Sequence, residues 1–430
     1  MLSVLASIFA LLAGVAFLGL ANGLLFTLLG VRMSIDGVAP QMIGIVGSAY
    51  YVGLLAGTLR CDRVIRRVGH IRAFTVFAAL SAISVLLLAL IPVPWVWAAL
   101  RAVMGFSMAG LFIVAESWLQ FRATNETRGR TFALYVIALT LGAGSGPLLI
   151  NLADPARYEL FLLASILFSV ALLPVALTRA SNPELGESAR FGLRELFAVS
   201  PVAVVGAFAT GLASSAFSTM APVYADRVGM TAIYISLLMT AVRLGGFVMQ
   251  YPIGSVSDRF DRRRVVIALG IGAAFATAAV AASGGGTPLL VLALACVYGA
   301  FSQPIYGLMV SHANDYVEPE TFVATSAGLL FAFGVGASAG PTAAALVMDW
   351  MGPSGLFVYL AVVPLAFCGF VAYRMGRRSP LPTAEQAGFV AVPPTLPAAG
   401  SALDPRAGPA EGAPAGLRSQ AGTGGGEGDA

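Results

Sequence analysis

The sequence has few charged residues, and lysine is absent from it altogether. Only 11% of the 430 residues are charged, and all 25 basic residues are arginine. Apolar residues make up 58% of the chain and the mean hydropathy is +0.85, whereas about half or less of a soluble domain is apolar. These values exclude a soluble globular protein and predict a chain that lies mostly within a lipid bilayer.

Cysteine and histidine are also scarce. Cys61, Cys296 and Cys368 are odd in number and none falls in an expected outer loop, so we expect neither a disulfide framework nor a metal site. His70 and His312 fall at loop edges, and no Ser/His, Cys/His or paired-carboxylate set lies within an expected span. We therefore predict no enzymatic activity and no cofactor.

Long apolar segments cover most of residues 5–374. About 20 apolar residues in a helix span the hydrocarbon core of a membrane. We expect twelve such spans, at residues 5–30, 41–59, 73–92, 94–119, 131–152, 157–178, 200–223, 231–253, 265–283, 287–310, 323–347 and 353–374. The first has no basic region before it and no evident cleavage site after it, so we expect a retained span rather than a signal peptide.

The arginines are distributed unevenly between the two sides of the expected membrane. If the even-numbered turns face the cytosol, 18 arginines lie on that side and only Arg32, Arg157 and Arg227 on the other. Because cytosolic loops carry an excess of basic residues, we expect both termini in the cytosol. The arginines are scattered over many turns, so the net charge of +4 does not indicate a nucleic-acid partner.

The two halves of the apolar region repeat each other. The sequence GAGSGP at Gly142–Pro147 returns as GASAGP at Gly336–Pro341, with the prolines 194 residues apart (341 − 147). Such repeats are typical of transporters that hold a site between two related bundles. We expect six-helix bundles at 1–178 and 200–374, a cytosolic linker at 179–199 with a short helix near 191–197, and a disordered cytosolic tail at 375–430 that is rich in Pro, Ala and Gly.

The densest charge cluster is the sequence GSVSDRFDRRR, which runs from Gly254 to Arg264 between two apolar segments. We expect it to lie in water at the cytosolic face. Asp258 can face the positive N-terminal end of a neighbouring helix, and Arg259 and Arg262 can reach carboxylates on adjacent spans. Such contacts would close an inner gate in one state and break in the other. Alternatively, the arginines only fix the topology.

A second copy of this cluster lies in the first half. A shift of 196 residues sets Asp62-Arg63 on Asp258-Arg259, and Arg66-Arg67 on Arg262-Arg263. We expect these four residues to act in gating as well. The copy is imperfect, because Thr58 falls opposite Gly254 and Asp62 can instead pair with Arg66 at i, i+4.

These clusters resemble the loop motif of the major facilitator superfamily of transporters. Arg101-Ala-Val-Met-Gly105 resembles the Arg-x-x-x-Gly signature of the family's fourth span, and Gly142–Pro147 resembles its antiporter motif, although Ile150 and Asn151 replace the final glycines. The segment from Glu116 to Arg130 resembles the uncharacterised bacterial YcaD-like branch, and this resemblance covers most of residues 5–374.

The resemblance implies an all-α membrane protein with twelve transmembrane helices in two pseudo-symmetric six-helix bundles. It also implies that Glu116 joins an inner charge network with Arg63 or Arg67. Gly146, Pro147, Gly340 and Pro341 would serve as packing or hinge residues, because small residues permit close helix contact and proline loosens a helix.

In this fold, spans 1, 4, 7 and 10 line a central cavity. The substrate candidates on these spans, together with the charge in the middle of span 8, are Asn22, Arg101, Ser214, Gln303, Tyr306 and Arg243. Arg101 either faces a cavity and takes part in coupling, or snorkels to the outer interface. Pro304 kinks span 10 and frees a carbonyl near Gln303, although the kink alone accounts for the proline.

The sequence thus predicts a secondary transporter of the bacterial inner membrane, working as a monomer by alternating access in proton-coupled efflux of a small organic molecule. Uptake, facilitated diffusion and a non-transporting sensor or scaffold with a partner-binding tail stay open as alternatives. The expected cavity has aromatic, neutral and arginine side chains but no carboxylate in the middle of the membrane. This favours neutral amphipathic solutes or organic anions over cations.

Overall fold

The computed structural model describes residues 2–122, 127–176, 193–284, 286–318, 321–377, 386 and 388–389. Every regular element in this part of the chain is a helix. A first helix group contains α1 (Leu2–Ile35), α2 (Pro40–Val68), α3 (His70–Leu90), α4 (Pro94–Arg122), α5 (Arg128–Ser145), the 3₁₀ helix η1 (Gly146–Leu152) and α6 (Glu159–Ala176). A second contains α7 (Leu193–Val199), α8 (Pro201–Arg227), α9 (Ala232–Ser257), α10 (Arg262–Ala282), α11 (Pro288–Ser302), α12 (Pro304–Asn314), α13 (Phe322–Met351) and α14 (Gly355–Met375).

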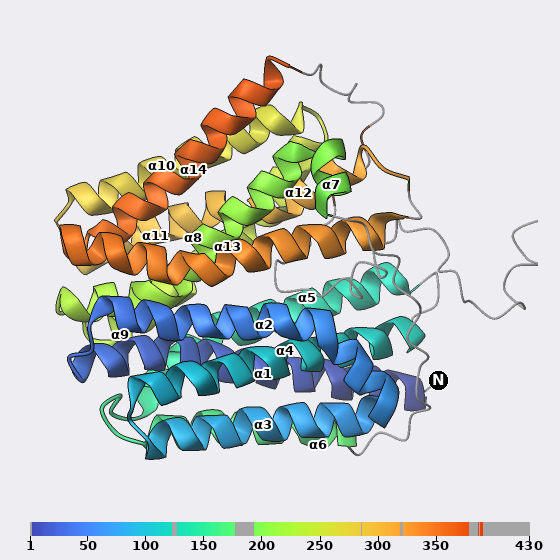
Figure 1. The fold of residues 1–430 in the computed structure, drawn as a ribbon, viewed down its shortest axis with the longest axis vertical. Helices are drawn as coiled ribbons and strands as arrows, with labels where there is room; N and C mark the ends of the chain where they lie inside the picture. Colours follow the sequence, from blue (N-terminus) through green and yellow to red (C-terminus); the bar gives the residue numbers. More distant parts are fainter. Residues whose placement is uncertain are drawn as a thin grey trace, which may run out of the picture.

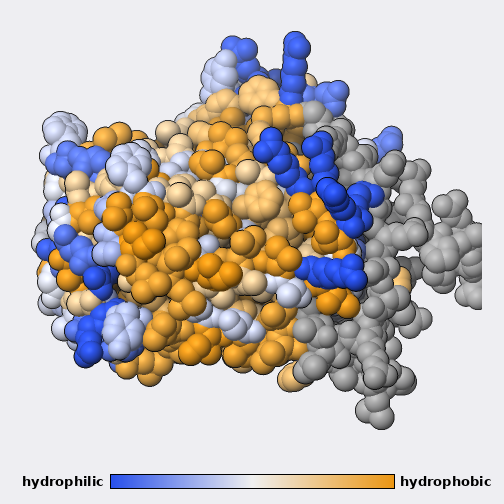
Figure 2. Space-filling model, turned by 60° about the horizontal axis from the view of Figure 1, so that its bottom comes forward, coloured by the Kyte–Doolittle hydropathy of each residue, from blue (hydrophilic) through white to orange (hydrophobic). Residues whose placement is uncertain are grey.

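Eleven helical segments of the described chain are long and apolar enough to cross a membrane, and eleven of the expected spans correspond to them. The remaining span, expected at 157–178, corresponds to α6, whose apolar stretch Glu159–Pro174 is shorter. The helix of this span is interrupted at Gln303, since α11 ends at Ser302 and α12 begins at Pro304. A kink at Pro304 stays a prediction. Figure 2 shows the result on one face, a broad apolar band with hydrophilic residues gathered towards its ends.

The two helix groups lie side by side with their helices running in the same general direction (Figure 1). The expected short helix of the linker is α7, at Leu193–Val199, and residues 179–192 of the linker lie outside the described chain. The end where α2 meets α3 and α9 meets α10 is called here the arginine-rich end, since it carries Arg60, Arg63, Arg66, Arg67, Arg72, Arg259, Arg262, Arg263 and Arg264. The opposite end, where α1 meets α2 and α8 meets α9, is the arginine-poor end.

The glycines of the repeated motif bring pairs of helices into backbone contact. A Cβ atom at Gly142 of α5 would overlap the carbonyl oxygen of Ala16 in α1, and one at Gly146 would overlap that of Leu20. Membrane helices gain no hydrophobic driving force from each other, so close packing of small residues supplies much of their association. The motif therefore fixes α5 against α1.

The second copy of the motif does the same in the second group. Cβ atoms at Gly336 and Gly340 of α13 would overlap the carbonyl oxygens of Phe208 and Leu212 in α8. The prolines behave differently, because α5 changes to the 3₁₀ helix η1 at Gly146, whereas α13 continues through Pro341. The two copies thus share their packing but not their backbone course.

Hydrogen bonds join the two groups near the arginine-poor end. Four such bonds are Ser48 Oγ with Thr342 Oγ1 (2.9 Å), Asn151 Nδ2 to Ser236 Oγ (2.9 Å), Thr240 Oγ1 to the Gly144 carbonyl (2.9 Å) and Arg227 Nη2 to the Val38 carbonyl (3.3 Å). Gly47 of α2 also packs directly on Thr219 of α8. The groups therefore meet closely at this end.

Gly336→Ala should destabilise the protein, because the added methyl group would force the backbones of α8 and α13 apart. Overpacking of this kind costs about 1–3 kcal/mol, which should lower the apparent melting temperature of the purified protein in detergent. Gly369→Ala in α14 is the matched control, since nothing lies within 4 Å of a Cβ atom there. Equal melting temperatures for the two variants would contradict the close contact.

Candidate functional site

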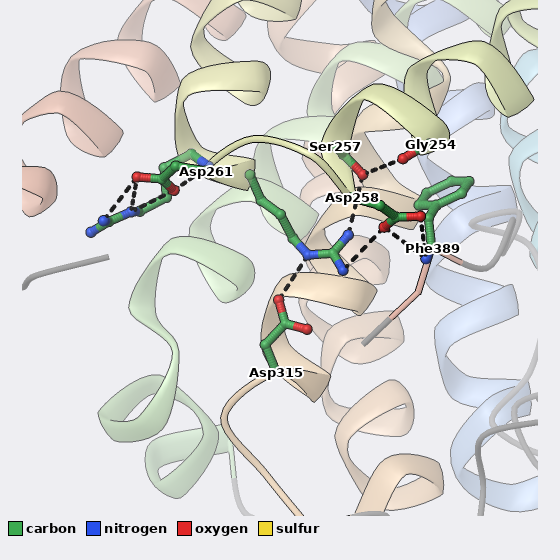
Figure 3. Close-up of polar contacts among 8 residues, drawn as sticks. Gly254, Ser257, Asp258, Asp261, Asp315 and Phe389 are labelled. Carbon is green, nitrogen blue, oxygen red and sulfur yellow. Dashed lines mark hydrogen bonds and ion pairs between the residues drawn. The ribbon is translucent and has the colours of Figure 1, made fainter. Parts of the chain in front are cut away.

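A buried arginine links three helix ends at the arginine-rich end of the second group (Figure 3). Arg262, at the start of α10, places its Nε 2.7 Å from Oδ2 of Asp315 and its Nη2 3.5 Å from Oδ1 of Asp258. Its Nη1 also donates to Ser257 Oγ at 3.2 Å. Because Asp258 and Ser257 end α9 while Asp315 follows α12, this one guanidinium ties the ends of α9, α10 and α12 together.

The burial of Arg262 corrects the expectation that the cluster lies in water. Arg262 is 1% exposed and the Asp315 side chain 2% exposed. A buried charge needs a close partner of opposite sign, and Asp315 supplies it. Asp315 was not among the residues expected from the sequence. The sequence did place Glu116, near the cytosolic end of span 4, close to the first cluster. The same argument in the second half points to an acid at the end of span 10.

Asp261 fixes the start of α10. Its carboxylate accepts a hydrogen bond from the backbone N–H of Arg263 (3.0 Å) and forms an ion pair with the Arg263 guanidinium (3.0 Å). Burial raises the pKa of Asp261, but the hydrogen bonds from Arg263 outweigh it and hold that pKa below its ordinary value. Arg263 is buried as well, whereas Arg259 and Arg264 are exposed.

A residue of the tail contacts the same cluster. The backbone N–H of Phe389 donates to both carboxylate oxygens of Asp258, at 2.9 and 3.2 Å, and its ring packs directly on Gly254 (Figure 3). Phe389 belongs to the tail that the composition predicts to be disordered, most of which lies outside the described chain. No sequence signal singled out this contact.

The copy in the first group is built differently. Helix α2 continues to Val68 and α3 begins at His70, so Gly69, with a φ of 84°, is the whole connection. Such a short turn is open to glycine because it has no side chain to clash at positive φ. Asp62, Arg63, Arg66 and Arg67 consequently lie in the last turns of α2, with the three arginines exposed.

Glu116 is fully buried in α4. Its Oε1 accepts a hydrogen bond from the hydroxyl of Tyr135 in α5 at 2.9 Å. Tyr135 was not among the expected site residues. An ion pair of Glu116 with Arg63 or Arg67 stays a prediction.

A second buried guanidinium lies closer to the arginine-poor end. Arg101 of α4 is 1% exposed, and its guanidinium carbon lies over two aromatic rings that contact each other, 4.4 Å from the centroid of Phe26 and 4.2 Å from that of Tyr50. Cation–π contacts of this kind attract a cation to the face of a ring. Snorkelling would leave the guanidinium exposed at the interface, so this geometry favours the other alternative, in which Arg101 faces the interior.

A small cavity lies beside Arg101 and is lined by residues of both helix groups. Its walls include Phe26, Gly30, Val46, Gly47, Arg101 and Thr219. Three buried polar atoms in this region have no hydrogen-bond partner among the described residues, namely Arg101 Nη1, Thr219 Oγ1 and Asn22 Oδ1. Phe26, Tyr50 and Thr219 escaped sequence reasoning, although Phe26 lies one helical turn from the candidate Asn22.

The remaining candidates are distributed around the two groups. Arg243 is half-buried in α9, and its Cβ lies 3.5 Å from the position of a Cβ on Gly144 of the first group. Tyr51 of α2 lies within electrostatic range of both Arg101 and Arg243. The structure thus brings two candidate arginines to one region between the groups.

Three candidates lie elsewhere in the second group. Ser214 is half-buried in α8, and Gln303 packs against Gly246 of α9. Tyr306 is buried edge-to-face against Phe333 of α13, with ring centroids 5.5 Å apart. Tyr306 therefore forms part of the packing between α12 and α13.

The chain is similar to known membrane transporters over most of its length. It is 27% identical over 383 residues to the uncharacterised MFS-type transporter YcaD of Escherichia coli O6:K15:H31 (strain 536), a match that covers 87% of this chain and 97% of YcaD. YcaD of Escherichia coli strain K12 (DH10B) matches with the same identity and coverage. Among solved structures, the nucleoside transporter NupG has the same fold, with a TM-score of 0.72 for a point mutant at 13% identity and 0.67 for a second NupG structure at 16% identity. These matches cover 85% of this chain and 99% and 96% of the NupG chains.

The family model of the Major Facilitator Superfamily matches residues 11–236 and 203–406, and so covers nearly all of the helices described above. With eleven candidate spans in the described chain, the protein is a multi-pass membrane protein that belongs to the Major Facilitator Superfamily.

Proposed function

We propose that this protein is a secondary transporter of the bacterial inner membrane that moves a small organic solute by alternating access, in proton-coupled efflux. It works as a monomer of twelve transmembrane helices, with α6 as the short sixth span. The arginine-rich end faces the cytosol, because basic residues are retained on that side. Both termini then lie in the cytosol, since α1 begins and α14 ends at the arginine-rich end.

One observation carries the proposal, the position of the contacts between the two helix groups. Hydrogen bonds join the groups near the arginine-poor end, and the small cavity beside Arg101 lies in the same part of the molecule. The contacts of Arg262 at the other end stay within the second group. An arrangement of this kind corresponds to a carrier that is closed towards the outside, and transport requires the hydrogen bonds of the arginine-poor end to break.

The proposed inner gate is the cluster around Asp258. The ion pair of Arg262 with Asp315 is buried and holds α9, α10 and α12 as one unit. Of the two acids that contact Arg262, Asp258 is the more exposed, with 37% of its side chain in solvent against 2% for Asp315. It is therefore the acid that remains available to the first group when the arginine-rich end closes. Direction and coupling rest on the resemblance of Gly142–Pro147 to the antiporter motif.

A disulfide across the arginine-poor end tests alternating access without a known substrate. In a chain with Cys61, Cys296 and Cys368 replaced by serine, Ser48→Cys and Thr342→Cys should form a disulfide on oxidation, because the two hydroxyl oxygens are 2.9 Å apart. A reporter cysteine at the half-buried Ser214 should react with a membrane-impermeant maleimide from both sides of the membrane before oxidation. After oxidation it should react only from the arginine-rich side, and reduction should restore both.

The matched controls are the two single variants, Ser48→Cys and Thr342→Cys, which should keep the reporter accessible from both sides under oxidation. A reporter that reacts from one side only, before and after oxidation, would refute alternating access. It would favour the sensor or scaffold alternative.

Removing one partner of the buried ion pair should destabilise the protein. Asp315→Asn should lower the free energy of unfolding by about 3–5 kcal/mol, because Arg262 would lose its closest carboxylate and keep only the longer contact to Asp258. The double variant Asp315→Leu with Arg262→Met should recover most of this loss, since an apolar pair has no charge to desolvate. Arg259→Gln, at an exposed position, is the control, and thermal unfolding in detergent measures all of them. An Asp315→Asn variant as stable as Arg259→Gln would contradict the structural role of the pair.

A further inference from the structure

We infer that the Arg101 guanidinium binds the carboxylate of a small amphipathic organic acid, and that such organic anions are the solutes carried. This inference rests on the proposed transport function. It names the chemical class of the solute and the atom that recognises it.

Arg101 keeps one donor open to a ligand. The Phe26 and Tyr50 ring centroids lie 4.4 and 4.2 Å from the guanidinium carbon and 4.9 Å from each other, so the two rings approach the guanidinium from the same side. Aromatic rings attract the cation but do not replace the hydrogen-bond acceptors that its N–H groups need. Nη1 is buried and has no acceptor among the described residues, which is a costly state for a charged donor.

The charge of Arg101 also lacks a counter-ion. No carboxylate of the described chain lies within 4.0 Å of it, whereas the comparably buried Arg262 has Asp315 at 2.7 Å. An arginine inside a membrane protein is normally paired or faces a functional cavity. A planar carboxylate from a solute would supply both the missing charge and two acceptors in the plane of the guanidinium.

The cavity beside Arg101 has a volume of about 10 Å³ in this structure, which holds about one water molecule, so a solute has to widen it. Its walls favour an apolar body on the carboxylate. Phe26, Leu29, Met33, Ile43 and Val46 line it with apolar side chains. Thr219 of the second helix group is the other polar wall, and its hydroxyl has no partner among the described residues. An acid bound there would touch Arg101 in one group and Thr219 in the other, so its binding depends on how closely the two groups meet at the arginine-poor end.

Matched carboxylates and amides test the inference. Benzoate, phenylacetate and hexanoate should be compared with benzamide, phenylacetamide and hexanamide by thermal shift and calorimetry on the purified full chain. We expect at least one carboxylate to bind wild type, its amide to bind at least about tenfold more weakly, and Arg101→Gln to lose that binding. Arg101→Lys, which keeps the charge but not the planar fork, should bind with intermediate affinity.

Arg157→Gln is the matched control, because it removes an exposed arginine that is not a candidate for the site, and it should leave carboxylate affinity within about twofold. Binding that is equal in wild type and Arg101→Gln, equal for acid and amide, or absent for every carboxylate on folded wild type would overturn the inference. The disulfide and reporter experiment uses no solute, so its failure is separate. If the reporter is accessible from both sides but no carboxylate binds, only the solute class is rejected. If a carboxylate binds but the reporter is accessible from one side only, only transport is rejected.

A different observation carries a second inference. We propose that Phe389 acts as a wedge that keeps the arginine-rich end open. On α9, Gly254 follows Ser236 by 18 residues, which is five full turns at 3.6 residues per turn, so both lie on one face of the helix. Ser236 accepts a hydrogen bond from Asn151 of the first group, so this is the face that α9 turns towards that group.

Phe389 covers that face at the arginine-rich end. Its ring fills the space left by the missing side chain of Gly254, and its backbone N–H is bound to Asp258. The first group can reach this part of α9 only after Phe389 has left. The contact therefore favours the state in which the arginine-poor end is closed, and losing it should shift the population towards the other state.

Phe389→Ala in the Ser214→Cys reporter chain tests the wedge. We expect labelling from the arginine-poor side to become at least about threefold faster, and labelling from the arginine-rich side to slow. Phe260→Ala is the matched control, because Phe260 is an exposed phenylalanine at the same end, with 58% of its surface in solvent. Labelling rates in Phe389→Ala that equal those of Phe260→Ala, or that shift in the opposite direction, would overturn the proposal.

Discussion

The structure depends on how a guanidinium is accommodated once it has left water. Arg262 and Arg263 are stabilised by carboxylates, Asp315 and Asp261, which are themselves at least partly buried and end or begin helices. Arg101 is stabilised instead by two aromatic rings, which attract a cation but do not neutralise its charge. The carboxylates make Arg262 a rigid link between helix ends and hold Arg263 at the start of α10. The aromatic rings leave the charge and one donor of Arg101 available to a ligand. This difference distinguishes the two structural arginines from the proposed binding arginine.

The two helix groups share their glycine packing but differ in their charge clusters. Backbone contact at Gly142 and at Gly336 fixes α5 on α1 and α13 on α8, so each group has a rigid pair of helices next to its partner group. The charge clusters then diverge. The first is part of α2 and leaves its arginines exposed, whereas the second has a true connection in which Arg262 is buried. The second cluster has an ion pair that binds three helix ends into one body.

Features that depend on neighbours in the sequence could be predicted, and features that depend on distant residues could not. The apolar spans, the repeated glycines and the break at Pro304 follow from composition, spacing and the missing N–H of proline. The partners of Arg262 and Arg101 lie 53 and 75 residues away at Asp315 and Phe26 (315 − 262 and 101 − 26), and no local pattern links them. Arg262 was expected in water because hydropathy counts its charge without the acid that neutralises it. The contact of Phe389 could not be predicted, because the composition of the tail indicates disorder whether or not a single residue of it binds to the helices.

The two proposed contacts, at Arg101 and at Phe389, act on one equilibrium from opposite ends of the molecule. A solute that touches Arg101 and Thr219 bridges the groups near the arginine-poor end, and Phe389 on Gly254 keeps them apart at the arginine-rich end. Because both contacts act on one equilibrium, by linkage each must change the strength of the other by an equal factor. The tail thereby becomes part of the transport cycle without touching the solute.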